Sequence, residues 1–111
     1  MRQAKSRIVS FFAESDQIPE VVQSIDNEVL PRFNELPHFL GFVGLQSESG
    51  SRPEVVGISL WASDLDDSEQ ASEEFRDEVH RVTGTTPSRK GYDVLRVMVY
   101  DADGELCIDL P

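Results

Sequence analysis

The pattern of apolar and polar positions is clearest in residues 55–61, where side chains of two kinds alternate. Successive side chains of a β-strand point to opposite faces of a sheet, so this alternation predicts a strand with two unlike faces. One face is aliphatic and continues past the strand, with Val56, Ile58, Leu60 and Ala62. The other carries Val55, Gly57, Ser59 and Trp61. We expect the aliphatic face to pack against helices, and the face that ends in Trp61 to line a cavity or a subunit contact.

Residues 7–14 and 39–47 also have the composition of strands. The first segment is rich in β-branched and aromatic residues in a nearly unbroken apolar run, which is typical of a strand covered on both faces. We therefore expect it to lie at the centre of its sheet. The second segment contains Gly41 and Gly44, and glycines inside a strand predict a bulge, a sharp twist or a close neighbour.

Residues 92–100 repeat this alternation and predict a fourth strand. One phase carries Leu95, Val97 and Val99, and the other carries Tyr92, Val94, Arg96, Met98 and Tyr100. An Asp-Ala-Asp-Gly sequence at residues 101–104 is typical of a tight turn. Residues 105–110 are then predicted to return as a short edge strand of a hairpin.

Two segments have apolar residues at the three- and four-residue spacing of an amphipathic helix. The first runs from Ile18 to Leu36 and follows capping oxygens at residues 15–16. Pro31 lies inside this segment. Because proline lacks an N–H and crowds the preceding turn, we expect a kink or an end near Leu30 and an irregular continuation to Leu36.

The second helix is predicted to begin directly after the third strand. Ser63 and Asp66 resemble a capping box, and acidic side chains in the first turn favour the positive end of a helix. An apolar stripe then runs from Leu65 to Val82. Gly84 is expected to end the helix.

The order of the predicted elements is strand, helix, strand, strand, helix, strand. Two split β-α-β units with right-handed crossovers give a ferredoxin-like α+β fold, in which an antiparallel sheet carries two helices on one face. A chain of this length is expected to form one domain, residues 1–111. The sheet face that carries Trp61, Met98 and Tyr100 would be bare in a monomer, so we expect a homodimer that packs sheet against sheet, or a ligand, to cover it.

Charge and composition exclude several classes of function. The chain has 10 Lys and Arg against 21 Asp and Glu, and this formal net charge of −11 repels nucleic acids and anionic membrane surfaces. No segment approaches the roughly 18 consecutive apolar residues of a membrane helix, so we expect a cytoplasmic protein. Cys107 has no second cysteine to pair with, and we expect it to be a small buried apolar residue.

Two motifs resemble one protein family. The first is Leu-Pro-x-Phe-Leu-Gly-Phe-Val-Gly at residues 36–44, and the second is Val-x-Ile-Ser-Leu-Trp-x-Ser at residues 56–63, which leads into a helix with Phe75. Over residues 7–100 the chain is similar to the antibiotic biosynthesis monooxygenases (ABM), which are dimeric α/β barrels. The resemblance implies a pocket between sheet and helices that holds a small organic, mainly aromatic, molecule and oxidises it without a cofactor.

Six side chains are candidates for such a site. Ser59, Trp61 and Met98 are candidate substrate contacts, and His80, Arg96 and Tyr100 are candidate catalytic groups. Arg96 lies among apolar residues, where its charge requires either a carboxylate of a second subunit or an anionic substrate. His80 could carry a proton, and Tyr100 could hydrogen-bond a substrate. The sequence has no metal-ligand motif or phosphate-binding loop, and we expect neither a metal nor a cofactor.

Two alternatives stay open. The first is a non-catalytic dimer of the same fold that acts as a sensor or a structural protein. The second is a haem-binding protein, because the haem-degrading members of the family have an iron-binding histidine near the end of the second helix, where His80 lies. Those members also have an asparagine in the first strand and a tryptophan in the second helical region. Ser10 and Gln70 stand at the comparable positions here, which disfavours haem degradation.

Overall fold

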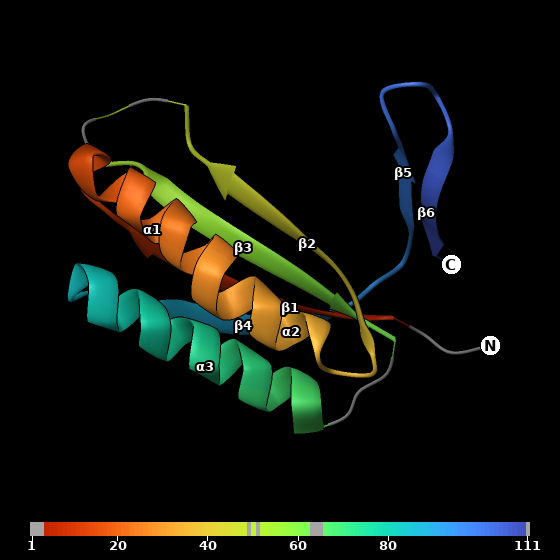
Figure 1. The fold of residues 1–111 in the computed structure, drawn as a ribbon, viewed down its shortest axis with the longest axis horizontal. Helices are drawn as coiled ribbons and strands as arrows, with labels where there is room; N and C mark the ends of the chain where they lie inside the picture. The colour runs from red at the N-terminus through yellow and green to blue at the C-terminus, as the bar shows by residue number, and fades with distance from the viewer. Residues whose placement is uncertain (1–3, 49, 51, 63–65, 111) are drawn as a thin grey trace.

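A computed structural model describes residues 4–48, 50, 52–62 and 66–110. The main sheet has four strands in the order β2-β3-β1-β4, and all neighbouring strands are antiparallel. The strands are β1 (Lys5–Phe12), β2 (Phe39–Gln46), β3 (Glu54–Trp61) and β4 (Ser88–Asp93). β1 lies between β3 and β4, which confirms the central position predicted for the first strand (Figure 1).

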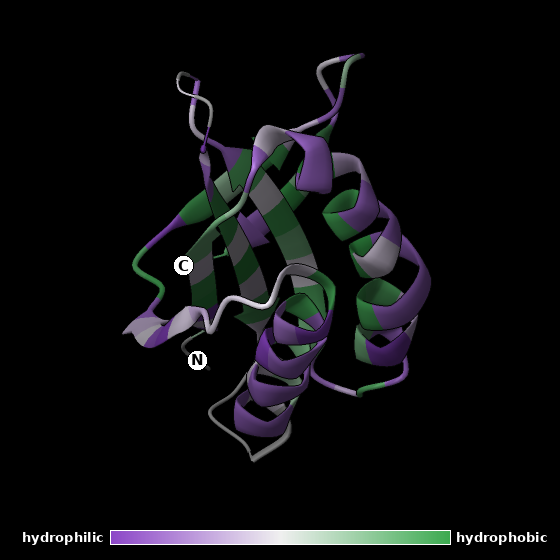
Figure 2. Cartoon of the chain, turned by 90° about the vertical axis from the view of Figure 1, so that its left-hand side faces the viewer, coloured by the Kyte–Doolittle hydropathy of each residue, from purple (hydrophilic) through white to green (hydrophobic). Residues whose placement is uncertain are grey.

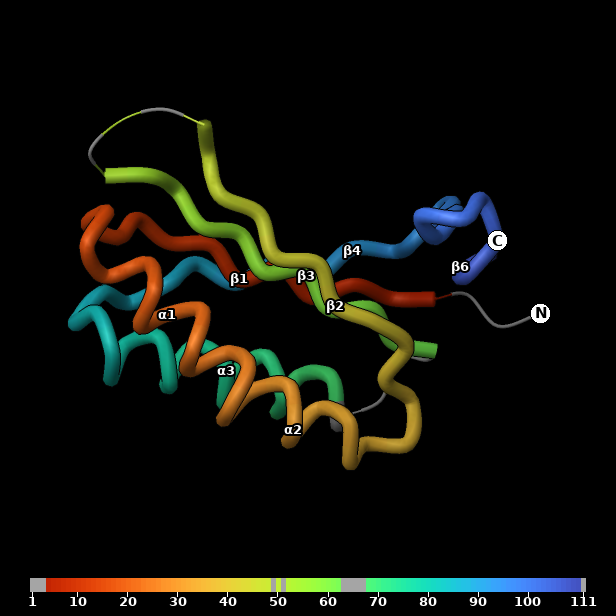
Figure 3. Tube along the Cα trace, turned by 45° about the horizontal axis from the view of Figure 1, so that its top comes forward, coloured from red at the N-terminus to blue at the C-terminus, as the bar shows by residue number. Residues whose placement is uncertain are grey.

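The helices lie together on one face of this sheet (Figure 3). The first helical segment consists of η1 (Ser15–Gln17), α1 (Ile18–Ser24), η2 (Ile25–Val29) and α2 (Leu30–Asn34), and the second is α3 (Asp66–Thr83). Both turn apolar residues towards the sheet (Figure 2). The predicted ferredoxin-like α+β fold is thereby confirmed. The predicted capping residue Ser63 and the predicted start of the apolar stripe, Leu65, lie outside the described residues.

The first helical segment is irregular where Pro31 was expected to disturb it. The segment η2 is π-helical, and the N–H of Leu30 donates to the carbonyl of Ile25. Pro31 has no N–H to donate and its ring crowds the turn before it, so a wider turn directly upstream relieves the crowding. The helix does not end near Leu30 but continues to Asn34.

The core between sheet and helices is built from aromatic rings. Phe33 lies at its centre, with ring centroids 5.5 Å from Phe39, 5.5 Å from Trp61 and 6.3 Å from Phe75. All three pairs meet edge to face, a geometry that stabilises beyond the burial of area alone. Trp61 is fully buried, with 0% of its surface exposed.

The orientation expected for the third strand is therefore wrong. Ser59 and Trp61 point into the core, whereas the aliphatic face of β3 points away from the helices. The physical reason is Gly57, where a Cβ would lie only 2.5 Å from Cε2 of Phe75. The missing side chain makes room for the Phe75 ring, so small residues on the strand and large rings on the helices fill the core together.

The fourth predicted strand is wrong in its extent. Residues 92–100 do not form one strand, because β4 ends at Asp93 and the chain leaves the main sheet before β5 (Val97–Tyr100). Asp93 pairs with Lys5, the first residue of β1. The N–H of Val94 still donates to the carbonyl of Ala4 at 2.9 Å, and Val94 is buried beside Ala4 and Leu60, so the chain departs from the main sheet only after Val94.

β5 instead pairs with β6 (Leu106–Leu110) in a hairpin that forms a sheet of its own (Figure 1). The predicted tight turn is confirmed, because the N–H of Asp101 donates to the carbonyl of Glu105 at 2.8 Å and Gly104 has a φ of 81°. Cys107 is exposed on this hairpin, so the expectation that it is buried is wrong. The described helices lie away from this hairpin (Figure 1).

The main sheet is apolar on the face that points away from the helices. This face, here called the open face, carries Ile8, Phe12, Val43, Leu45, Val56 and Ile58. Phe12 and Leu45 are each 51% exposed. The hairpin covers one end of the open face, where Val97 and Leu110 pack against the cluster that contains Leu60. The hairpin also exposes apolar residues of its own, namely Leu95, Met98, Val99, Tyr100 and Leu106.

Candidate ligand pocket

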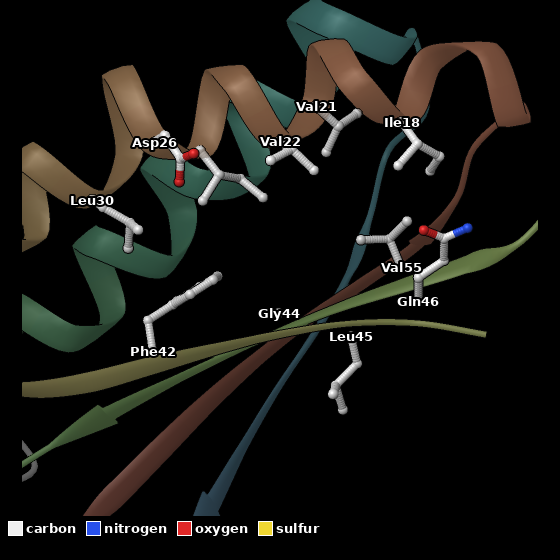
Figure 4. A pocket seen from close by; sticks show the side chains of 11 residues that line it. Ile18, Val21, Val22, Asp26, Leu30, Phe42, Gly44, Leu45, Gln46 and Val55 are labelled. Carbon is white, nitrogen blue, oxygen red and sulfur yellow. The ribbon is translucent and has the colours of Figure 1, made fainter. Parts of the chain in front are cut away.

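A cavity of about 340 Å³ lies between the first helical segment and strands β2 and β3 (Figure 4). The helical segment contributes Ile18, Val21, Val22, Ile25, Asp26 and Leu30 to its lining, and the strands contribute Phe42, Gly44, Leu45, Gln46 and Val55. Small-molecule sites have volumes of about 300–1,000 Å³ and walls that are mostly apolar. This cavity has both properties, and its volume is at the lower end of the range.

Local sequence explains how the cavity forms. Four aliphatic residues at helical spacing share one side of the helical segment: Ile18, Val21, Val22 and Ile25. On the sheet, Gly44 pairs with Gly57, so two neighbouring strands lack side chains there. Phe42 stands beside this gap, held against Phe75 at a ring-centroid distance of 5.7 Å. The Phe75 ring fills the space over Gly57, so the open space lies over Gly44, and Phe42 closes one end of it.

Two polar side chains interrupt the apolar lining. Asp26 extends from the helix, and Gln46 extends from the last residue of β2 (Figure 4). Within the described part of the chain, neither side chain has a hydrogen-bond or ion-pair partner. A few polar groups in an apolar pocket are the usual means by which a site fixes the orientation of a ligand. Sequence reasoning missed both residues, because their local patterns are those of exposed polar positions.

Ser59 and Trp61 lie in the aromatic core, outside the lining of this cavity. Trp61 Nε1 donates to Ser59 Oγ at 2.8 Å, and the Ser59 hydroxyl donates to the carbonyl of Arg7 at 3.2 Å. Each polar atom therefore has a partner inside the protein. The geometry gives both residues a packing role, and substrate contact by either of them stays a prediction.

Arg96, Met98 and Tyr100 lie on or beside the hairpin, away from the cavity. The guanidinium of Arg96 forms an ion pair with Asp109 and donates to the carbonyl of Leu110 at 2.7 Å. The Tyr100 hydroxyl donates to Met98 Sδ at 3.3 Å. The carboxylate that Arg96 requires is thus supplied by the same chain, while the predicted roles of all three side chains in a site stay predictions.

His80 lies on the exposed side of α3, and its Nδ1 is 3.4 Å from Thr86 Oγ1. The structure brings none of the candidate catalytic groups to the cavity. Among the described residues there is no group of three or more His, Cys, Asp or Glu side chains that could hold a metal ion. None of the helices in the described chain combines the length and the apolar character that crossing a membrane requires.

A charged clamp fixes the helix that forms the roof of the cavity. Glu78 of α3 forms a hydrogen bond with Ser24 of α1 and accepts two from Arg81, at 2.9 Å from Nε and 2.6 Å from Nη2. The Arg81 guanidinium is the main reason that the pKa of Glu78 falls from 4.5 to about 2, and the Ser24 hydroxyl adds to the effect. The clamp joins the two helices one turn away from Val21, which lies in the cavity wall.

Solved structures have the same arrangement of elements. One is a protein from Nitrosomonas europaea with a provisional assignment as an antibiotic biosynthesis monooxygenase. It superposes with a TM-score of 0.65 at 16% identity, covering 86% of this chain and 93% of that chain. The chain has the ABM fold. The resemblance seen in the two sequence motifs is therefore confirmed at the level of the fold.

Two further solved structures superpose on the chain in the same way. A monooxygenase from the gene ActVA-Orf6 of Streptomyces coelicolor, in complex with Nanaomycin D, has a TM-score of 0.64 and 17% identity, covering 90% of this chain and 95% of that chain. SnoaB, a cofactor-independent oxygenase from Streptomyces nogalater, has a TM-score of 0.60 and 11% identity, with coverages of 87% and 97%. No family model and no curated protein matches the sequence. Likeness at these identities establishes the fold, which does not by itself fix the chemistry.

Proposed function

We propose that this protein is a homodimer that binds a small, flat, mainly aromatic organic molecule in the pocket between the first helical segment and the sheet. The observation that carries the proposal is the cavity of about 340 Å³, with aliphatic walls, one phenyl ring and two unpartnered polar side chains. Aliphatic walls favour a ligand without many polar groups. The gap above Gly44 favours a flat ligand, because no side chain rises from β2 at this position.

The reaction that fits this pocket is cofactor-independent oxygenation of an electron-rich ring system. In the overall step a ring CH₂ group and O₂ give a carbonyl group and water. One oxygen atom enters the substrate, and the two hydrogens leave with the other oxygen atom. The substrate supplies all four electrons, so no cofactor is required. This activity is supported by the ABM fold and by the cofactor-independent oxygenase that shares it.

A second copy of the chain is the partner that fits the open face. Phe12, Val43 and Leu45 are exposed on the sheet, and Met98 and Tyr100 are exposed on the neighbouring hairpin. Large apolar side chains exposed together on one face of a sheet mark an interaction site. A symmetric dimer buries the same patch on both subunits.

A non-catalytic dimer of the same fold is the competing proposal. It is favoured by the positions of the candidate catalytic groups, because His80, Arg96 and Tyr100 all lie outside the cavity lining. In such a protein the pocket would bind a ligand as a sensor, or serve no ligand at all.

The pocket assignment is tested by a substitution whose side chain fills the pocket. Gly44→Leu adds a side chain on the helix side of β2, where a Cβ meets only Phe42 Cε1 at 3.6 Å. We expect Gly44→Leu to abolish binding of 2-naphthol, followed by its fluorescence. Gln23→Leu, on the exposed outer side of α1, is the matched control and should leave binding unchanged. Equal binding by both variants would overturn the pocket assignment.

Oxygen uptake separates the two proposals. With naphthalene-1,3-diol as the electron-rich probe and metal-depleted protein, an oxygenase consumes O₂ and Gly44→Leu abolishes the consumption. Binding of the diol without any O₂ uptake would instead support the non-catalytic dimer.

A further inference from the structure

The carboxylate of Asp26 is a charged group in a pocket wall that is otherwise mostly apolar. It extends from η2 with aliphatic neighbours, and Val22 and Leu30 line the wall on either side of it (Figure 4). A carboxylate that loses contact with water must gain a partner, since an unanswered charge in apolar surroundings is costly. Among the described residues nothing donates to Asp26 or pairs with it, and the side chain is exposed to solvent.

A ligand that enters this pocket displaces the water that hydrates Asp26. Since no group of the described chain donates to Asp26, a ligand that covers this carboxylate must supply the donor itself. We infer that the ligand carries a hydroxyl group on its ring system and donates it to the carboxylate of Asp26, and that the same carboxylate excludes anionic ligands. This inference rests on the proposed function, because it names the class of ligand that the proposed pocket accepts.

The charges around the pocket support the exclusion of anions. No Lys, Arg or His contributes to the lining, so an anionic ligand would meet Asp26 without a compensating cation. The formal net charge of −11 adds a general repulsion of anions. A neutral hydroxyl avoids both costs, and its hydrogen bond to a charged acceptor is stronger than one to a neutral acceptor.

The same π-helical turn contains a matched control for this inference, two residues after Asp26. Glu28 lies on the same segment as Asp26 but lines a different groove, together with Arg32 and Glu74. The two acids contribute the same charge to the whole molecule and face different surroundings. Short π-helical turns inside α-helices are frequently found at functional sites, which is consistent with a role for the residue that this one carries into the cavity.

The test uses three naphthalenes of similar size: 2-naphthol, 2-methylnaphthalene and naphthalene-2-carboxylate. For the natural chain we expect the affinity to be highest for 2-naphthol and lowest for the carboxylate. Asp26→Ala should weaken 2-naphthol about tenfold, the effect of losing roughly 1.4 kcal/mol. Asp26→Asn should tighten the binding of naphthalene-2-carboxylate, because it removes the repelling charge. Thermal unfolding of each variant confirms that it is folded.

Glu28→Gln separates local from general charge effects. It changes the net charge as much as Asp26→Asn does, and we expect it to leave the affinities for all three probes within about twofold, which is less than 0.5 kcal/mol. Equal effects of the Glu28 and Asp26 substitutions would overturn the inference.

Failure of the inference can be told apart from failure of the proposed function. Binding of 2-methylnaphthalene as tight as that of 2-naphthol, or tight binding of the carboxylate to the natural chain, would overturn the role of Asp26 and leave the pocket in place. Failure of all three naphthalenes to bind would overturn both.

Discussion

The two faces of the main sheet differ in how completely the chain covers them. On the helix side, Phe33, Trp61 and Phe75 are fully buried. The Phe33 ring meets each of the other two rings edge to face. On the open face, Val43 and Leu45 are equally apolar but exposed, although they belong to a strand that pairs with the same β3. The helices therefore complete one core, whereas within the described residues the hairpin covers one end of the second apolar surface.

This difference indicates that each face of the sheet has a separate role. The helix side encloses a packed core, and the candidate pocket lies beside this core at Gly44. The open face is an exposed apolar surface, and the neighbouring hairpin exposes further apolar side chains. A gap inside a packed layer suits a small molecule, whereas a broad apolar surface suits a partner.

The largest expected contrast between the faces is the cost of removing one side chain from each. Phe33→Ala should lower the free energy of unfolding by about 4 kcal/mol, because Phe33 is 1% exposed and contacts four other rings. Val43→Ala on the open face should cost no more than about 1 kcal/mol in the dissociated chain. Urea denaturation at low protein concentration measures both. Similar costs would show that the two faces are equally packed.

Adding a methyl group at a glycine tests how tightly the chain is packed around that position. Gly57→Ala places a Cβ 2.5 Å from Phe75 and should cost about 2 kcal/mol through overpacking. Gly41→Ala is the control on β2, since its Cβ would meet Ile108 Cδ1 at an ordinary 3.7 Å. We expect Gly41→Ala to change the midpoint of thermal unfolding little. A harmless Gly57→Ala would contradict the packing described for Phe75.

Removing a buried hydrogen bond is expected to have a smaller effect. Ser59→Ala leaves Trp61 Nε1 without its acceptor at 2.8 Å, which should cost about 1–2 kcal/mol. If Ser59 instead contacts a ligand in the pocket, the substitution would change the affinity for 2-naphthol more than it changes stability. Denaturation and probe binding on the same variant distinguish these outcomes.

The smallest effect is expected at the clamp between the helices, and it depends on pH. The folded-state pKa of Glu78 is lowered to about 2, so its contribution to stability is complete above the ordinary value of 4.5 and is lost as the pH falls towards 2. Glu78→Gln should cost about 1 kcal/mol at pH 7, since the exposed Arg81 leaves the pair partly screened by solvent.

The difference in stability between the natural chain and Glu78→Gln should therefore shrink between pH 4.5 and about 2. Glu73→Gln, on the exposed side of α3, removes the same charge away from the clamp and is the control for general charge effects. A constant difference across this range would mean that Arg81 does not hold Glu78 ionised.

The sequence predicts the order of elements well because that information is local. The central place of β1, the continued helix with a disturbance before Pro31, and a bulge near Gly41 all follow from the spacing of a few neighbouring residues. The register shift between Phe39 and Gly41 confirms the bulge. The spacing of residues does not predict which face of β3 packs against the helices, since that depends on the fit between Gly57 and a ring on α3.

The candidate site was less predictable for the same reason. Arg96 finds its carboxylate thirteen residues further along the chain, at Asp109, and only the hairpin geometry brings the two together. Asp26 and Gln46 carry no local signal, because they become pocket residues only where the helix lies over Gly44 of β2. A pocket is a property of two surfaces, and each surface is encoded in a different part of the chain.

Sedimentation equilibrium of the full chain at micromolar concentration tests most directly whether the open face is covered by a second copy. We expect a particle of twice the 12.5 kDa mass of one chain, which Val43→Lys converts to the single mass. A particle of 12.5 kDa for the natural chain would contradict it, because the apolar side chains of the open face would then stay in contact with water.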